Sequence, residues 1–351
     1  KIQICSRISG FDVPMKSDIE PAKVFQASFE GTGVDLYLIG SRKYFDREGI
    51  YDDPKTKKGH IDSMERFVFF MKAALELLPR LGFSVNIVHC HDSHTALVPG
   101  LIRTAHAANS FFTGMRTLLT IHNLAYQGIY SKESLEYAGI DSSHFSPMSP
   151  YEFYGNVNFL KAGIQLADKV NTVSPTYAHE IQTNAEMGMG LEGVLSSRKK
   201  DLSGIINGID YAEWNPETDR LIPARYSHRD LTGKARCKKQ LLEYFGLPQS
   251  NKRMPLVGIV SRLAEQKGFD LIGETIEEIA ALEMQLVVLG TGQQKYHDLF
   301  QNMASRFPAK IAVRFAFDNA MAHLIEAGCD MFLMPSRFEP CGLNQLYSFR
   351  Y

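Results

Sequence analysis

The final stretch of the chain reads Met331-Phe332-Leu333-Met334-Pro335-Ser336-Arg337-Phe338-Glu339-Pro340-Cys341-Gly342-Leu343. Its first four residues are apolar, which is typical of a buried strand. Glu339 therefore follows the carboxyl end of a predicted strand, and Gly342 has no side chain that would keep a ligand away from the backbone. In open α/β sheets, ligands bind at this edge. The stretch predicts an α/β fold with a ligand site at the carboxyl ends of its strands.

The same alternation of strands and helices runs through most of the chain. We predict strands at residues 35–40, 85–90, 116–121, 169–173, 202–206, 255–260, 285–290, 311–317 and 331–334. Helical spacing predicts helices at 63–81, 96–107, 159–167 and 234–245. Such alternation favours mostly parallel sheets with helices on both faces. Residues 210–254 interrupt the pattern with polar, proline-containing sequence. We therefore expect two doubly wound, Rossmann-like domains facing a cleft, 1–209 and 210–351.

The composition is that of an ordinary globular protein. The 351 residues are 44% hydrophobic and 22% charged, with a net charge of −1. This balance gives no sign of nucleic acid binding, and no apolar run reaches the roughly 18 residues that cross a bilayer. We expect neither nucleic acid nor a membrane as a partner. Five scattered cysteines without a C-x-x-C pair favour free thiols in a reducing compartment.

The ends of the chain suggest a piece of a longer protein. It begins with Lys1 instead of methionine and stops soon after Gly342. We expect the first domain to lack its start and the second domain to lack its end.

Two loops of the second domain carry candidate ligand-binding residues. Arg262 and Lys267 follow the predicted strand 255–260, and a planar guanidinium with an ammonium group suits a diphosphate. A solvated loop with two cations is the alternative. Gly290 and Gly292 follow the next predicted strand and would lie on the same edge, although such glycines also form ordinary turns.

Histidines mark the ends of two predicted strands in the first domain. His89 and His91 lie on one face of their strand, and with Asp92 or His94 they could bind a metal, line a polar substrate site or be structural. His122 follows the next strand and could exchange hydrogen bonds with a sugar, or could simply be a satisfied histidine beside a turn.

Taken together, several motifs resemble the bacterial glycogen synthase and plant starch synthase family of retaining glucosyltransferases. They occur in the family's order at residues 89–94, 122–128, 159–163, 173–177, 207–210, 261–268 and 335–343. The resemblance implies the GT-B fold and transfer of glucose from ADP-glucose to the non-reducing end of an α-1,4-glucan, glycogen or starch. It implies no cofactor and no metal, and a bacterial cytoplasm or a plastid stroma as the compartment.

The resemblance also implies roles for individual residues. Arg262 and Lys267 would neutralise the donor diphosphate, Glu339 would hold the glucose hydroxyls, and His122 would accept a glucose hydroxyl or offer its carbonyl. Further donor contacts would come from Asn207, Gly290, Gly292, Phe317, Cys341, Gly342 and Leu343. The acceptor side would include Asp92, His94, Asn123 and Tyr126.

Three other functions fit parts of the sequence. The enzyme could use UDP-glucose as its donor. The protein could be a non-catalytic glucan-binding relative with the same fold, although the presence of Arg262, Lys267 and Glu339 together argues against it. A metal-dependent hydrolase built on His89 and His91 is the third alternative, but it lacks a convincing set of further ligands on later strands.

Overall fold

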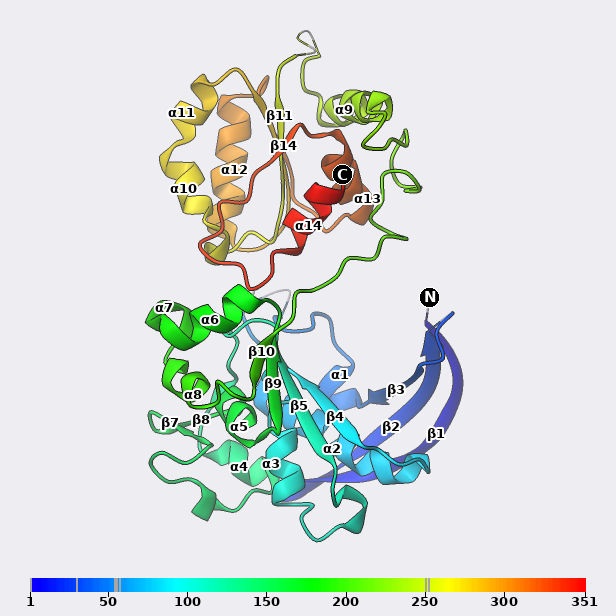
Figure 1. Cartoon of the computed structure of the whole chain (residues 1–351), viewed down its shortest axis with the longest axis vertical. Coiled ribbons are helices and arrows are strands. Elements are labelled where there is room, and N and C mark those ends of the chain that lie inside the picture. Colours follow the sequence, from blue (N-terminus) through cyan, green and yellow to red (C-terminus); the bar gives the residue numbers. More distant parts are fainter. Residues whose placement is uncertain (1, 30, 54–55, 57, 250, 252) are drawn as a thin grey trace. The chain divides into compact units, whose positions relative to one another are not determined.

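The computed structural model describes residues 2–29, 31–53, 56, 58–249, 251 and 253–351, with side chains from residue 8 onward. The described chain forms two compact units, Lys1–Ile206 and Asn207–Tyr351 (Figure 1). Each unit contains a four-stranded parallel sheet with helices packed against it. This is the predicted α/β architecture, and each unit is described separately below.

The parallel sheet of the first unit has the strand order β10-β9-β5-β4. Its strands are β4 (Ile87–His91), β5 (Arg116–Ile121), β9 (Lys169–Thr172) and β10 (Leu202–Gly204). The main helices are α2 (Ser63–Leu77), α3 (Val98–Arg103), α5 (Phe159–Leu166), α6 (Pro175–Thr183) and α8 (Glu192–Ser197). Asn158 and Ser174 begin α5 and α6 by accepting hydrogen bonds from backbone N–H groups of the first turn.

A separate antiparallel sheet precedes the parallel one. It consists of β1 (Ile2–Met15), β2 (Asp18–Phe29) and β3 (Asp35–Gly40), drawn in blue in Figure 1. The sequence analysis placed residues 35–40 in the mostly parallel pattern and predicted no strand before them. That assignment is wrong, because β3 follows β2 after a short loop and therefore pairs with it antiparallel.

The first unit also contains shorter elements. They are α1 (Arg42–Phe45), η1 (Leu78–Leu81), η2 (Ser110–Phe112), β6 (Ile129–Tyr130), α4 (Glu133–Ala138), η3 (Ser142–His144), β7 (Glu152–Phe153), β8 (Asn156–Asn158) and α7 (Ala185–Gly188). Strands β6, β8 and β7 form a small antiparallel sheet in that order. The core of the unit is apolar, with Phe69, Leu119 and Phe159 fully buried.

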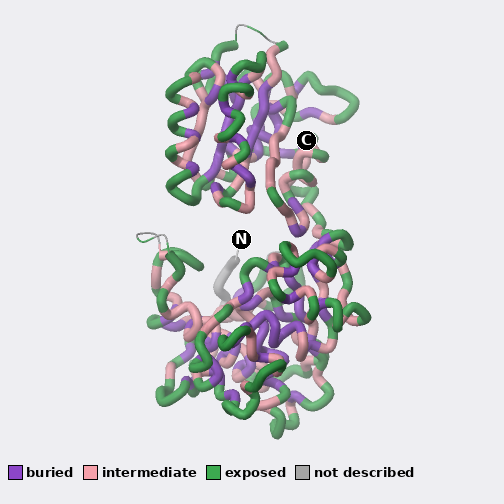
Figure 2. Tube along the Cα trace, turned by 90° about the vertical axis from the view of Figure 1, so that its left-hand side faces the viewer, coloured by how far each residue is buried: buried purple, intermediate pink, exposed green. Residues whose placement is uncertain are grey.

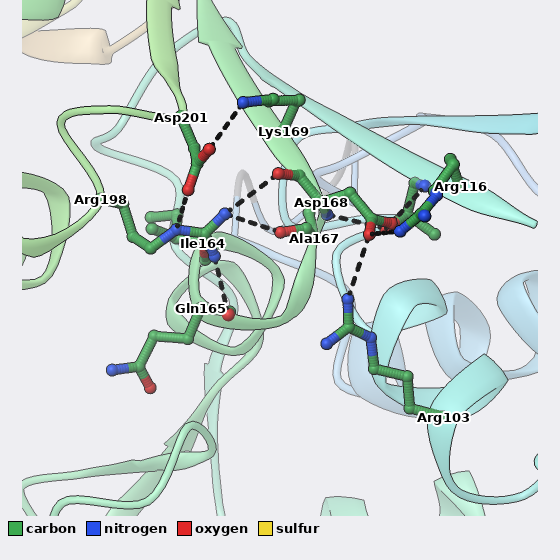
Figure 3. Close-up of polar contacts among 10 residues, drawn as sticks. Arg103, Arg116, Ile164, Gln165, Ala167, Asp168, Lys169, Arg198 and Asp201 are labelled. Atoms are coloured by element: carbon green, nitrogen blue, oxygen red, sulfur yellow. Dashed lines mark hydrogen bonds and ion pairs between the residues drawn. The ribbon is translucent and has the colours of Figure 1, made fainter.

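A polar network fastens the amino ends of β5 and β9 (Figure 3). Asp168, directly before β9, accepts hydrogen bonds of 2.8 Å from both the backbone N–H and the hydroxyl of Thr117 on β5, and Arg116 pairs with it at 3.1 Å. Burial alone would raise the pKa of Asp168, but these hydrogen bonds outweigh it and lower the pKa. Arg198 donates hydrogen bonds to the Ile164 carbonyl at the end of α5. The contacts of this network lie at the amino edge of the sheet and not at its carboxyl edge.

The parallel sheet of the second unit has the order β13-β12-β11-β14. Its strands are β11 (Leu256–Val260), β12 (Gln285–Leu289), β13 (Ile311–Arg314) and β14 (Met331–Phe332). The prediction of a strand over residues 331–334 is confirmed at residues 331–332 only, and the prediction that it is buried is wrong. In the described structure β14 is a two-residue edge strand paired only with β11, so the Met331 side chain is half exposed.

Helices cover both faces of this sheet. They are α9 (Thr232–Phe245), η4 (Glu265–Lys267), α10 (Phe269–Glu274), α11 (Ile276–Ala281), α12 (Gln294–Arg306), α13 (Asn319–Gly328) and α14 (Leu343–Arg350). One apolar cluster joins α9 and α13 to the sheet, and another joins α10, α11 and α12. Figure 2 accordingly shows the buried residues concentrated on the strands between the helices.

The segment that opens the second unit is anchored by its tryptophan. The Trp214 ring stacks between His323 of α13 and Tyr347 of α14, with centroid distances of 3.8 and 3.9 Å. Close by, Ser348 of α14 donates a 2.8 Å hydrogen bond to the carboxylate of Glu326, which is only 5% exposed. Burial raises the pKa of Glu326 to about 7.

We expect the second unit to lose stability as pH rises through 7. The pKa of Glu326 is raised above its ordinary value of 4.5, so its contribution is complete below about pH 4.5 and is lost above about 7. Glu326→Gln keeps an acceptor for Ser348 without the charge and should stabilise the unit by up to about 3 kcal/mol at pH 8.5, but hardly at pH 4.5. Urea unfolding followed by fluorescence of Trp214, the single tryptophan, measures this difference. An equal effect of the substitution at both pH values would contradict it.

Candidate functional site

The loops at the carboxyl edge of the second sheet are tied to one another. All four strands are parallel, so the loops after β11, β12 and β14 leave the sheet at the same edge. Leu263, after β11, donates its N–H to the Thr291 carbonyl at 2.9 Å, and the Gln293 N–H donates back to the Leu263 carbonyl at 2.8 Å. The predicted positions Gly290 and Gly292 therefore lie beside the loop that carries Arg262 and Lys267.

An ion pair joins two of the predicted catalytic residues. Lys267 Nζ lies 2.5 Å from Glu339 Oε1, and both side chains are about four-fifths buried, with 21% and 20% of their surfaces exposed. The Ser336 hydroxyl donates a 2.7 Å hydrogen bond to the same carboxylate oxygen. A partly buried pair with a third partner is held more firmly than a solvent-exposed one.

Backbone contacts hold the two loops of this ion pair together. The Gln266 side-chain amide donates to the Phe338 carbonyl at 3.1 Å, and the Arg337 N–H donates to the Gln266 carbonyl at 2.9 Å. Neither Ser336 nor Gln266 was predicted from the sequence. Both lie within the quoted motifs, which were the available signal. Ser336 contacts Glu339 within its own motif, whereas the partners of Gln266 lie in a distant part of the chain.

Two glycines permit these close approaches. Gly268 has φ +67°, and a Cβ there would lie 2.1 Å from the Pro335 carbonyl oxygen. A Cβ on Gly290 would lie 2.0 Å from the Ser261 carbonyl oxygen. Neither position can hold a larger residue without moving backbone, so at Gly290 the glycine has a packing role in addition to its turn.

The other predicted donor residues lie around this edge of the second unit. Arg262 is exposed, and Phe317, after β13, has 96% of its surface exposed. Gly342 directly precedes α14 and has φ +71°, and Leu343 is the first residue of that helix. The Asn344 side chain of α14 donates to the Val260 carbonyl at the end of β11, which brings the 339–343 loop to the sheet. Cys341 is partly exposed and has no disulfide, and Asn207 begins the unit.

In the first unit, three predicted histidines meet at the carboxyl edge of the parallel sheet. His89 Nε2 lies 2.6 Å from the Thr120 hydroxyl, and His91 Nδ1 lies 3.0 Å from His122 Nε2. The Asp92 carboxylate accepts a 2.7 Å hydrogen bond from the backbone N–H of His122. Partial burial lowers the pKa of His89 and of His91, and the neighbouring His122 lowers both further.

The remaining acceptor-side predictions fall near the same edge. The His94 ring lies against Phe67 and Tyr51, at centroid distances of 4.4 and 5.2 Å, and burial lowers its pKa. Tyr126 is half exposed, whereas the Asn123 side chain accepts a local hydrogen bond from the Ala125 N–H and shapes the turn after β5.

Within the part of the chain that the structure describes, no group of three or more His, Cys, Asp or Glu side chains is arranged to hold a metal ion. The Nδ1 atom of His91 is hydrogen-bonded to His122. A search of the described helices also finds none that is both long and apolar enough to cross a membrane.

Comparison with known proteins places the two units in one class. Residues 243–347 match the family model described as glycosyl transferases group 1, and residues 1–197 match the model described as starch synthase catalytic domain. The chain thus has the architecture of a two-domain glycosyltransferase. It belongs to the starch synthase catalytic domain family. This membership disagrees with the metal-dependent hydrolase considered from the sequence.

Individual relatives agree with this assignment. A glycogen synthase of Koribacter versatilis is 49% identical over 91% of this chain and 64% of its own length, and one of Thermosipho africanus is 43% identical over 97% and 68%. The solved catalytic domain of starch synthase IV from Arabidopsis thaliana, bound to ADP and acarbose, superposes with a TM-score of 0.88 at 34% identity, over 100% of this chain and 70% of that one. The chain spans about two thirds of the length of the curated relatives it matches.

Gly268→Ala should destabilise the second unit more than a matched glycine substitution elsewhere. Gly246 has a similar φ of +68° but open space around the position of a Cβ, so Gly246→Ala should cost only about 1–2 kcal/mol of backbone strain. Gly268→Ala should add about 1–3 kcal/mol, because the Pro335 carbonyl must move. Urea unfolding followed by Trp214 fluorescence compares the two variants. Equal losses of unfolding free energy would show that the close contact at Gly268 does not contribute to stability.

Proposed function

We propose that the protein containing this chain transfers glucose from ADP-glucose to the non-reducing end of an α-1,4-glucan, with retention of configuration. The names of the curated relatives and the ADP in the Arabidopsis starch synthase IV structure support a nucleotide-sugar donor and a glucan acceptor. The observation that carries the proposal within this chain is the Lys267–Glu339 pair at the carboxyl edge of the second sheet.

The pair provides opposite charges for the two halves of a sugar nucleotide. Lys267, with the exposed Arg262 on the same loop, would contact the diphosphate and stabilise the negative charge that develops on the departing nucleotide. Glu339 would accept hydrogen bonds from glucose hydroxyls, beside the backbone N–H groups of Cys341, Gly342 and Leu343. Lys267 and Glu339 also neutralise each other, so the donor would have to replace this ion pair with its own charges and hydroxyls.

The remaining predicted residues would contact the glucosyl group, the nucleotide or the acceptor. His122 would accept a hydrogen bond from a glucose hydroxyl. Asn207, Gly290 and Gly292 would line the donor site. Phe317 would pack against the base of the nucleotide. Asp92, His94, Asn123 and Tyr126 would contact the glucan. For retention we propose departure and attack on one face of the sugar, with the leaving phosphate accepting the proton of the acceptor hydroxyl.

ADP-glucose is the preferred donor in this proposal because the solved starch synthase IV structure contains ADP, and UDP-glucose is the alternative that the experiment below tests. We place the protein in a bacterial cytoplasm, since its relatives include bacterial glycogen synthases such as those of Koribacter versatilis and Thermosipho africanus. A plastid stroma is the corresponding compartment if the source is a plant.

The decisive experiment measures transfer of labelled glucose to glycogen by the protein at the length of its relatives. ADP-glucose should be used more efficiently than UDP-glucose. Lys267→Ala and Glu339→Ala should each lower kcat/KM by at least about 100-fold, because each removes a charge that contacts the transition state and leaves its partner unpaired.

Lys295→Ala is the matched control. Lys295 also pairs with a glutamate of the second unit, Glu265 at 3.3 Å, but both side chains are more than half exposed, so its loss should leave kcat/KM within about twofold. Glucan binding without transfer from either donor would reject the synthase and favour a glucan-binding relative.

A further inference from the structure

The histidines at the carboxyl edge of the first sheet form a connected row. His89 and His91 lie on the same face of β4, with ring centroids 4.2 Å apart, and His91 then reaches His122 across the edge of the sheet. The register explains this contact, because His91 lies opposite Thr120 in the parallel ladder and His122 follows two residues later. The planes of the His91 and His122 rings are inclined by 29°, and their centroids lie 5.2 Å apart.

Hydrogen bonds hold the backbone at both His91 and His122. The Thr95 hydroxyl accepts the His91 N–H at 2.6 Å and donates to the His91 carbonyl at 2.8 Å. The His122 N–H is held by Asp92, at 2.7 Å, and the Asp92 N–H donates in turn to the Thr120 carbonyl. The contacts do not by themselves show which ring nitrogens carry the protons.

The hydrogen bond between the rings restricts those protons. A neutral imidazole has one N–H donor and one acceptor nitrogen, so one ring must donate and the other accept. If His122 donates through Nε2–H to Nδ1 of His91, both rings keep the Nε2–H tautomer, which is the more stable one for a neutral histidine. The reverse direction would force both rings into the less stable Nδ1–H form.

We propose that His91 is a positioning residue that holds His122 in the Nε2–H tautomer and leaves His122 Nδ1 as a hydrogen-bond acceptor. The hydrogen bond made by one ring nitrogen determines whether the other ring nitrogen carries a proton, as it does for histidines in metal and catalytic sites. That His122 Nδ1 accepts a hydroxyl of the glucosyl donor rests on the proposed function. The tautomer itself does not depend on it.

The surroundings keep His91 in this neutral form. The titratable groups around it are His89 on β4 and Asp92 after it, and His89 makes a further positive charge on His91 unfavourable. Burial together with His89 and His122 lowers the pKa of His91, against the opposing effect of Asp92. A proton on His91 Nδ1 would also remove the acceptor of the His122 bond.

The tautomer can be measured directly on the full 351-residue chain. Long-range ¹H–¹⁵N spectra of histidine side chains distinguish protonated from unprotonated ring nitrogens. At pH 8, His122 should show a protonated Nε2 and an unprotonated Nδ1. His91→Phe keeps a ring beside His89 but removes the acceptor, so His122 should become a mixture of tautomers. His91→Asn places an amide oxygen near the Nδ1 position and should restore the single tautomer.

His228→Phe is the control, because His228 is an exposed histidine of the second unit. It should leave the His122 signals unchanged. Identical His122 signals in the unsubstituted chain and in His91→Phe would overturn the proposal, as would an Nδ1–H tautomer in the unsubstituted chain.

A kinetic measurement on the longer protein tests the link to the substrate. His91→Phe should lower kcat/KM for the sugar nucleotide by about fivefold, the equivalent of about one hydrogen bond, and His91→Asn should recover most of it. A tautomer change without any change in kcat/KM would overturn the role of His122 Nδ1 as a substrate acceptor. Absence of all transfer would instead reject the proposed function, while the spectra would still decide the role of His91.

Discussion

The second unit depends on the absence of a side chain at Gly268. There the turn after β11 lies directly against the Pro335 carbonyl of the loop after β14. This approach lets Gln266 form its two hydrogen bonds to the other loop and brings Lys267 onto Glu339. One backbone contact thereby sets the distance between two charges that come from distant parts of the chain.

The polar contacts at the two edges of the first parallel sheet differ in kind. At the amino edge, Asp168 and Arg198 fasten strands and helix ends with hydrogen bonds to the backbone. At the carboxyl edge, the side chains of His91 and His122 bond to one another. A network that satisfies backbone groups stabilises the fold, whereas side chains paired with each other can exchange those partners for a ligand.

In each unit, one pair of polar side chains at the carboxyl edge satisfies its own charges or hydrogen bonds. Lys267 and Glu339 neutralise each other, and the hydrogen bond between His91 and His122 gives each ring a partner. Such pairing limits the cost of partly buried polar groups. Under the proposed function, a sugar nucleotide would have to replace these interactions, which favours ligands that offer both anionic and hydroxyl groups.

The local sequence was sufficient for most strands, for the α/β class and for the motifs that indicate the family. The apolar run at 255–260, for example, agrees with β11 (Leu256–Val260) to within one residue, because burial on both faces leaves an unbroken apolar signal. The antiparallel pairing of β3 and the exposed edge position of β14 were not predictable in this way. The Lys267–Glu339 and His91–His122 contacts also appeared only in the folded chain. Apolar periodicity reports which side chains are buried, but the partner of a strand or a charge is decided by which distant segments the tertiary fold brings together.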